Sequence, residues 1–99
     1  MMNYEIFKEV VAEKFMDFMP EQYQDMHLDV HPVDKVNQTM DALTLTGENV
    51  RVSPTIYIND IYEDYKVSDN LQDVLKTAAS RMDKAMIQAG EVLPSIDLD

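Results

Sequence analysis

The chain has 99 residues, no cysteine, and a formal net charge of −11 from 19 acidic and 8 basic side chains. This length corresponds to one domain, and the lack of cysteine excludes disulfides, thiolate metal ligands and a cysteine nucleophile. Small secreted domains often need disulfides, and residues 1–5 lack the basic and apolar regions of a signal peptide. We therefore expect a cytoplasmic protein. No apolar run approaches the roughly 20 residues that cross a bilayer, so no membrane contact is expected.

The N-terminal segment predicts a helix over residues 3–19. Asn3 is a suitable N-cap, and Pro20 ends the helix before a short extra turn. Apolar side chains recur at helical spacing along one face, at Phe7, Val10, Val11, Phe15 and Phe18. Carboxylates follow at intervals of four along another face, at Glu5, Glu9, Glu13 and Asp17. The helix is therefore expected to be buried on one side and acidic on the other.

The middle of the chain predicts three strands. Residues 26–33, 40–46 and 50–58 each alternate between apolar and polar side chains, which is typical of half-buried strands. The turn residues Gly47-Glu48-Asn49 predict that the last two strands form a hairpin. Pro54 has no N–H for a sheet hydrogen bond, so we expect an edge or a bulge there.

The C-terminal third predicts a short helix over residues 60–66 and a long amphipathic helix from Leu71, ended by Gly90. Residues 1–90 are expected to form one α+β domain, and residues 91–99 an acidic C-terminal tail. Each strand has one apolar side, so helices need to cover only one face of the sheet. The predicted fold is a three-stranded antiparallel sheet with two main helices on one face, in the order α-β-β-β-short α-α.

The segment Ser53-Pro54-Thr55-Ile56-Tyr57-Ile58-Asn59, followed by Ile61-Tyr62-Glu63-Asp64-Tyr65, is the most distinctive part of the chain. Together with the opening residues 2–7 and residues 71–75, it resembles a family of uncharacterised bacterial proteins. These are a domain of unknown function from anaerobic Gram-positive gut bacteria and their mobile elements. The resemblance covers residues 2–80 and implies that the chain corresponds to the N-terminal region of longer members. It implies no activity, cofactor or catalytic residue.

The sequence contains only weak candidates for catalytic or metal-binding residues. His27, Asp29 and His31 share one strand face, where alternate side chains are about 7 Å apart. A divalent metal site is one interpretation of these residues, and an exposed polar strand face is the simpler one. No serine lies in a nucleophile motif, and adjacent carboxylates such as Glu63 and Asp64 occur by chance in so acidic a chain. We therefore expect no enzyme, metal or cofactor, and a small hydrolase is the less favoured alternative.

Tyrosines near the third strand suggest a partner-binding surface. Tyrosine is enriched at interfaces because it buries a large area and keeps a polar tip. The candidate residues are Tyr57, Tyr62 and Tyr65 with the neighbouring carboxylates Asp60, Glu63 and Asp64. The alternative is that the three rings pack at the edge of the core.

The function expected from the sequence is that of a non-enzymatic, acidic protein-binding module whose partner has a basic surface. A sharper version is an inhibitor of a nucleic-acid-binding host protein, such as a CRISPR nuclease, that presents carboxylates in place of phosphates. A regulatory or accessory domain is the alternative. Nucleic acid itself is not an expected partner. Double-stranded-RNA-binding domains have a similar order of elements and present lysine to the phosphates at the start of the last helix. Here that position carries Asp69, Asn70, Gln72 and Asp73, which repel phosphates.

Overall fold

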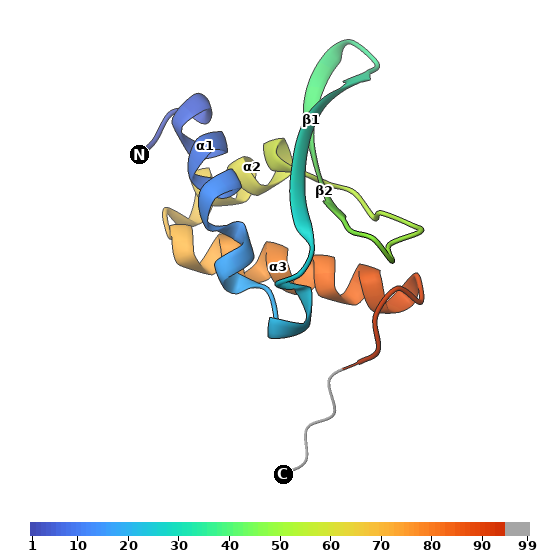
Figure 1. Ribbon diagram of the computed structural model, residues 1–99. Coiled ribbons are helices and arrows are strands. Elements are labelled where there is room, and N and C mark those ends of the chain that lie inside the picture. The colour runs from blue at the N-terminus through green and yellow to red at the C-terminus, as the bar shows by residue number, and fades with distance from the viewer. Residues whose placement is uncertain (95–99) are drawn as a thin grey trace.

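The computed structural model describes residues 1–94, which form an α+β fold with a three-stranded antiparallel sheet (Figure 1). The predicted fold class is confirmed. The elements in chain order are α1 (Tyr4–Lys14), two short 3₁₀ helices (Phe15–Phe18 and Glu21–Tyr23), β1 (His27–Lys35), β2 (Gln38–Thr46), β3 (Ile56–Tyr57), α2 (Ile58–Ser68) and α3 (Leu71–Gln88).

The first helix begins where the sequence predicted. The side chain of Asn3 accepts a hydrogen bond of 3.0 Å from the backbone N–H of Ile6, which satisfies one of the free donors at a helix start. The expected helix over residues 3–19 divides into α1 and a 3₁₀ turn, because Lys14 departs from α-helical angles at φ −110° and ψ −13°. Met19 is extended, as expected for the residue before a proline.

The tight hairpin of the sheet joins β1 to β2, and not the last two strands as predicted. Lys35 pairs with Gln38, so only Val36 and Asn37 form the turn. Asn37 has a φ of 69°, a left-handed conformation that asparagine adopts more easily than most residues. The connection from β2 to β3 is instead a long loop over residues 47–55.

The third strand is much shorter than the predicted segment 50–58, since only Ile56 and Tyr57 pair with β2. The backbone N–H groups of Arg51 and Val52 donate to the carboxylate of Glu91, at 3.0 and 2.8 Å, and not to a neighbouring strand. Pro54 has no N–H to give. The loop before β3 is thus held by a side chain from beyond the last helix, and the predicted sheet edge or bulge at Pro54 does not form.

Side chains extend the bonding between β2 and β3 where the backbone pairing stops. The hydroxyl of Ser53 donates to the carbonyl of Leu45 at 3.0 Å, and the backbone N–H of Asp41 donates to the side-chain oxygen of Asn59 at 2.7 Å. These two bonds flank the short strand on either side. They satisfy groups on β2 that a longer third strand would have paired.

The helix α2 is longer than the predicted short helix over residues 60–66, and α3 agrees with the predicted long helix from Leu71. α2 has 11 residues and ends at Asp69 in a left-handed conformation, with a φ of 50°. Gly90 ends α3 as predicted, with a φ of 75°, and the N–H of Glu91 donates to the carbonyl of Met86 at 3.0 Å. Val92 packs against the core. Glu91 and Val92, which the sequence assigned to the tail, therefore contact the rest of the fold, and residues 95–99 of the expected tail lie outside the described residues.

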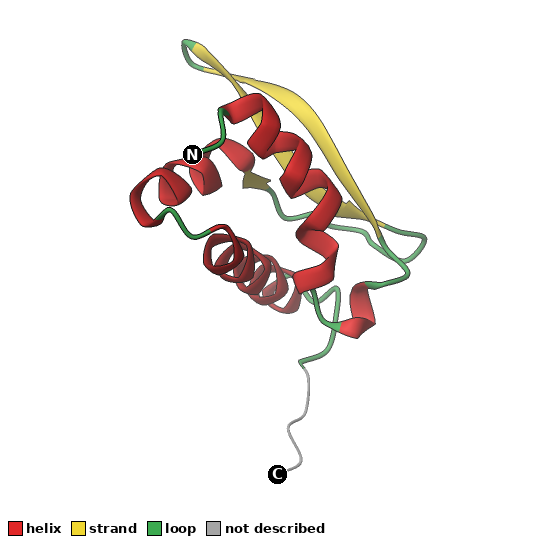
Figure 2. Ribbon diagram, turned by 90° about the vertical axis from the view of Figure 1, so that its left-hand side faces the viewer, coloured by secondary structure: helices red, strands yellow, loops and turns green. Residues whose placement is uncertain are grey.

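All three helices lie on one face of the sheet (Figure 2). The register places Leu43 and Leu45 on this inner face, and both are completely buried. Ala42 and Thr44 alternate with them and face away from the helices, yet they are also buried because β2 is the central strand. The one-sided arrangement agrees with the apolar side that each strand shows in the sequence.

Candidate functional site

Four aromatic rings meet where α1 crosses α2, and two of the predicted binding tyrosines are among them. Tyr65 is 5% exposed and stacks on Phe7 with ring centroids 5.0 Å apart and planes at 25°. Tyr62 is half-buried, lies edge-on against Tyr4 at 5.3 Å, and donates from its hydroxyl to the carbonyl of Met2 at 3.0 Å. Tyr65 thus belongs to the core and Tyr62 to its rim, so both rings hold α2 against α1.

Tyr57 lies apart from this cluster. It pairs with Ala42 on the face of the sheet that carries no helix, and it is half-buried there. The ammonium of Lys35 lies 4.6 Å from the centre of the Tyr57 ring, close enough for a cation–π contact. The structure therefore does not bring Tyr57, Tyr62 and Tyr65 together into one exposed surface. The chain turns directly from β3 into α2, which sends the later tyrosines to the inner side.

The predicted carboxylates on α2 are exposed, but two of the three are paired. Glu63 accepts from Lys66 at 2.8 Å, and this hydrogen bond raises the pKa of Lys66. Asp64 lies 3.7 Å from Arg81 on α3. Asp60 is in the first turn of α2, where the helix dipole favours a negative charge. These pairs neutralise much of the local charge, so α2 presents a weaker negative surface than its sequence suggests.

The strongest run of negative charge follows the outer side of α1 and continues into the 3₁₀ turn. We call it the α1 acidic stripe, and its members are Glu5, Glu9, Glu13 and Asp17, all exposed. Lys8 contacts Glu5 at 3.4 Å and Asp41 at 3.8 Å. Within residues 1–94, the other three carboxylates of the stripe make no ion pair. The spacing of four residues places the three glutamates on one face of α1, opposite the buried Phe7 and Val11.

The histidines of β1 lie on the helix-free face of the sheet. Nδ1 of His31 is 2.8 Å from a carboxylate oxygen of Asp29, and both side chains are about half exposed. Across residues 1–94, there is no group of three or more His, Cys, Asp or Glu side chains that could hold a metal ion. A two-residue pair at the surface fits the polar-face interpretation of these residues.

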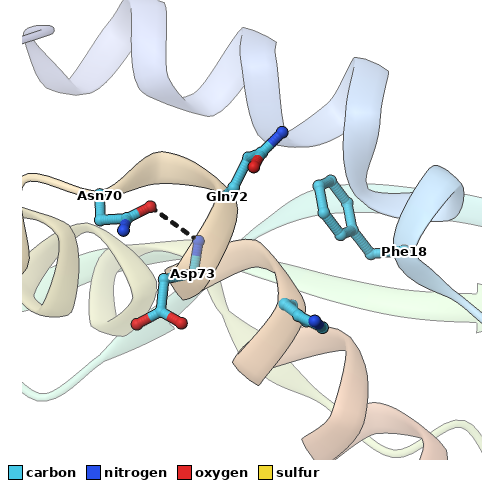
Figure 3. A pocket seen from close by; sticks show the side chains of 5 residues that line it. Phe18, Asn70, Gln72 and Asp73 are labelled. Carbon is cyan, nitrogen blue, oxygen red and sulfur yellow. Dashed lines mark hydrogen bonds between the residues drawn. The ribbon is translucent and has the colours of Figure 1, made fainter.

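A shallow pocket of about 290 Å³ lies at the start of α3 (Figure 3). Its lining includes Phe18, Asn70, Gln72 and Asp73. The side chain of Asn70 caps the helix by accepting from the N–H of Asp73 at 3.1 Å. The Asp73 carboxylate adds negative charge in the first turn. Lys76 also lines the pocket, but Asp73 offsets its charge and Asn70 already caps the helix start, which makes it a poor phosphate site.

Two tyrosine–aspartate hydrogen bonds were not predicted. The hydroxyl of Tyr4 donates to Asp41 at 2.5 Å, and that of Tyr23 donates to Asp83 at 2.6 Å. Burial raises the pKa of both tyrosines well above the ordinary value, and the hydrogen bond and the charge of each aspartate raise it further. The partners are 37 and 60 residues apart, so these hydrogen bonds cannot be predicted from local sequence spacing. They tie helices to the rest of the fold and are not arranged as a nucleophile with its base.

Within residues 1–94, no helix is long and apolar enough to cross a membrane. Neither the curated proteins nor the solved structures include a match to this chain. A family model does match residues 4–95, which extends beyond the expected resemblance over residues 2–80. The match agrees with the expected membership of an uncharacterised domain family. The chain belongs to DUF5688, a family of unknown function.

Proposed function

We propose that this domain is a non-enzymatic protein-binding module that recognises a partner with a basic surface. The observation that carries the proposal is the α1 acidic stripe, in which three exposed glutamates share one face of α1 and the exposed Asp17 follows in the 3₁₀ turn. Among residues 1–94, Glu5 is the only one of the four that is close to a cation. Uncompensated like charges on one face destabilise a helix slightly. A basic partner would relieve that repulsion.

The net charge of the whole chain also favours a basic partner. A formal net charge of −11 on 99 residues attracts basic proteins from a distance and raises their association rate more than it changes their dissociation rate. The carboxylates of the stripe follow one another along α1 and the next turn, so we expect the stripe to make the largest local contribution to this attraction.

The sharper hypothesis is inhibition of a nucleic-acid-binding host protein through carboxylates that take the place of phosphates. Carboxylates four residues apart are about 6 Å apart along a helix axis, whereas duplex DNA carries one charge per roughly 1.7 Å. The stripe alone therefore has a much lower charge per unit length than the phosphates of duplex DNA. Its geometry supports attraction to a basic protein surface more strongly than close imitation of DNA.

The test compares two variants that each remove four negative charges. The first neutralises the stripe by E5Q, E9Q, E13Q and D17N. The control neutralises exposed carboxylates away from α1, by E21Q, D25N, E48Q and D69N. A partner is captured from the native host, purified, and its association rate measured by surface plasmon resonance between 0.05 and 0.5 M salt, where the Debye length falls severalfold.

We expect the stripe variant to associate about tenfold more slowly at low salt, since close exposed charges set the steering rate. The control is expected to slow association much less, because its charges are dispersed. Equal effects of the two variants would mean that net charge acts without any role for the stripe. An association rate that does not depend on salt would refute the proposal.

A further inference from the structure

Among residues 1–94, no strand pairs with the backbone groups along the outer edge of β1. The sheet order is β1-β2-β3, so β1 has a neighbour on one side only within the described residues. The two-residue turn fixes which groups face outward. Lys35 and Gln38 close the turn and exchange hydrogen bonds, and bonded and non-bonded pairs then alternate along the hairpin. The odd-numbered residues of β1 therefore bond to β2, and the even-numbered residues point their N–H and C=O groups to the free edge.

Two independent contacts agree with this assignment. The carbonyl of His27 accepts from the hydroxyl of Thr46 on β2 at 3.4 Å, so it points inward as an odd-numbered residue should. Pro32, which has no N–H, is even-numbered and costs the hairpin no hydrogen bond. Its ring also blocks the half of the free edge nearest the turn, a common protection of edge strands.

The half of the edge before Pro32 is open. There Leu28 and Val30 present two N–H donors and two C=O acceptors, enough for one short extended segment. Their side chains are only partly buried and pack at the margin of the core. A strand laid along this edge would bond to all four groups and would cover these two side chains. This is the arrangement by which extended peptides add to the edges of sheets in other domains.

The charge around the edge indicates what kind of segment fits. α1 runs alongside β1 in both views (Figures 1 and 2), and its outer side carries the α1 acidic stripe. Asp29 lies between Leu28 and Val30 in sequence, and its side chain is exposed on the helix-free face of the sheet. Lysine or arginine side chains on an added strand would meet the carboxylate of Asp29 on the helix-free face, and the negative charge of the chain would attract them from a distance. A second copy of this chain would instead bring a further charge of −11.

We propose that residues 27–31 of β1 accept an extended, basic segment of a partner protein as a fourth strand of the sheet. The inference rests on the proposed function and specifies how the partner is held. The carboxylates attract the segment, and the backbone groups of Leu28 and Val30 fix its direction and register.

The first test uses a defined probe, the peptide acetyl-Val-Lys-Val-Lys-Val-Lys-Val-amide, with amide hydrogen exchange followed by NMR. Without peptide, the amides of Leu28 and Val30 should exchange quickly, whereas those of Asp29 and His31 are protected by β2. With peptide in 0.05 M salt, Leu28 and Val30 should gain about tenfold protection or more, as expected for new hydrogen bonds. A peptide of the same length with glutamate in place of lysine is the control and should give no protection.

The outcomes separate this inference from the proposed function. Binding of the lysine peptide that leaves Leu28 and Val30 unprotected overturns strand addition and leaves attraction to a basic partner intact. No binding at 0.05 M salt overturns strand addition as well. Protection that grows with protein concentration and needs no peptide would show that a second copy occupies the edge, which also overturns the inference.

A second test uses proline to remove one outward N–H. V30P removes a donor at the open edge, and V36P places proline on the same hairpin at an 88% exposed turn position. Proline is common at this position before a residue with positive φ. For a purified partner, we expect V30P to weaken binding about tenfold, equal to about 1.4 kcal/mol, and V36P to bind as the wild type does. Equal binding of folded V30P and V36P would overturn the inference. If V30P does not fold, the exchange experiment on the unaltered protein decides.

Discussion

The hydrogen bond from Tyr23 to Asp83 is expected to be one of the largest polar contributions to the stability of the fold. The ring of Tyr23 is completely buried, and its hydroxyl donates to Asp83 at 2.6 Å, which joins the second 3₁₀ turn to α3. Y23F removes the hydroxyl and keeps the ring, so it opens no cavity. The change in the free energy of unfolding is therefore a measure of the hydrogen bond.

Hydrogen bonds to charged groups contribute about 1.5–3 kcal/mol. Asp83 is half-exposed, so water can partly replace the lost donor, and we expect a loss near the lower end, about 1.5 kcal/mol. In a domain of this length, that loss lowers Tm by roughly 6–12 °C. Urea and thermal unfolding at pH 7, followed by circular dichroism, measure both quantities.

The control is Y57F, which removes a hydroxyl from a half-buried ring on the helix-free face and should change stability by less than about 0.5 kcal/mol. D83N and the Y23F/D83N double variant complete a thermodynamic cycle. If the bond acts as the structure indicates, the double variant loses less than the sum of the two single variants. Additive losses, or a Y23F variant as stable as the wild type, would refute the reasoning.

Three further outcomes follow from other contacts. Folding raises the pKa values of Tyr4 and Tyr23. The two hydroxyl groups therefore contribute fully to the free energy of unfolding below the unfolded-state pKa of about 10, and this contribution is lost as the pH rises above it. Urea unfolding should show a fall in stability between pH 10 and 12 that is smaller in the Y4F/Y23F variant; an equal fall in both would contradict this. E91A should speed trypsin cleavage after Arg51, because the carboxylate that holds the loop is gone; unchanged cleavage would show that the loop is held by other contacts. N37V should cost roughly 1–2 kcal/mol in chemical denaturation, because a β-branched residue is strained at positive φ, whereas N37G should stay close to the wild type; equal stabilities would argue against the left-handed turn.

The helices and their covered face could be predicted because their signals are local. Apolar spacing and the caps at Asn3, Asn70 and Gly90 lie within a turn or two of the ends that they define. The tight hairpin turn was missed because Val36-Asn37 contains no glycine, while Gly47 offered a more familiar turn signal.

The remaining differences depend on residues distant in sequence. Residues 50–55 alternate like a strand, but the N–H groups of Arg51 and Val52 donate to the carboxylate of Glu91, 40 and 39 residues away. The α1 acidic stripe was visible from its spacing alone. The burial of Tyr65 was not visible, because it depends on stacking with Phe7 in a different helix.

The attachment of the loop to Glu91 has a consequence for how the chain folds during its synthesis. The β1–β2 hairpin needs only neighbouring residues and can form within microseconds once it leaves the ribosome. The segment before β3 then has to wait for Glu91, which is made after all of α3. At ordinary elongation rates of about 5–20 residues per second, this delay is two seconds or longer. During that time the loop before β3 lacks its contacts with Glu91, and chaperones or neighbouring chains can bind its free N–H groups.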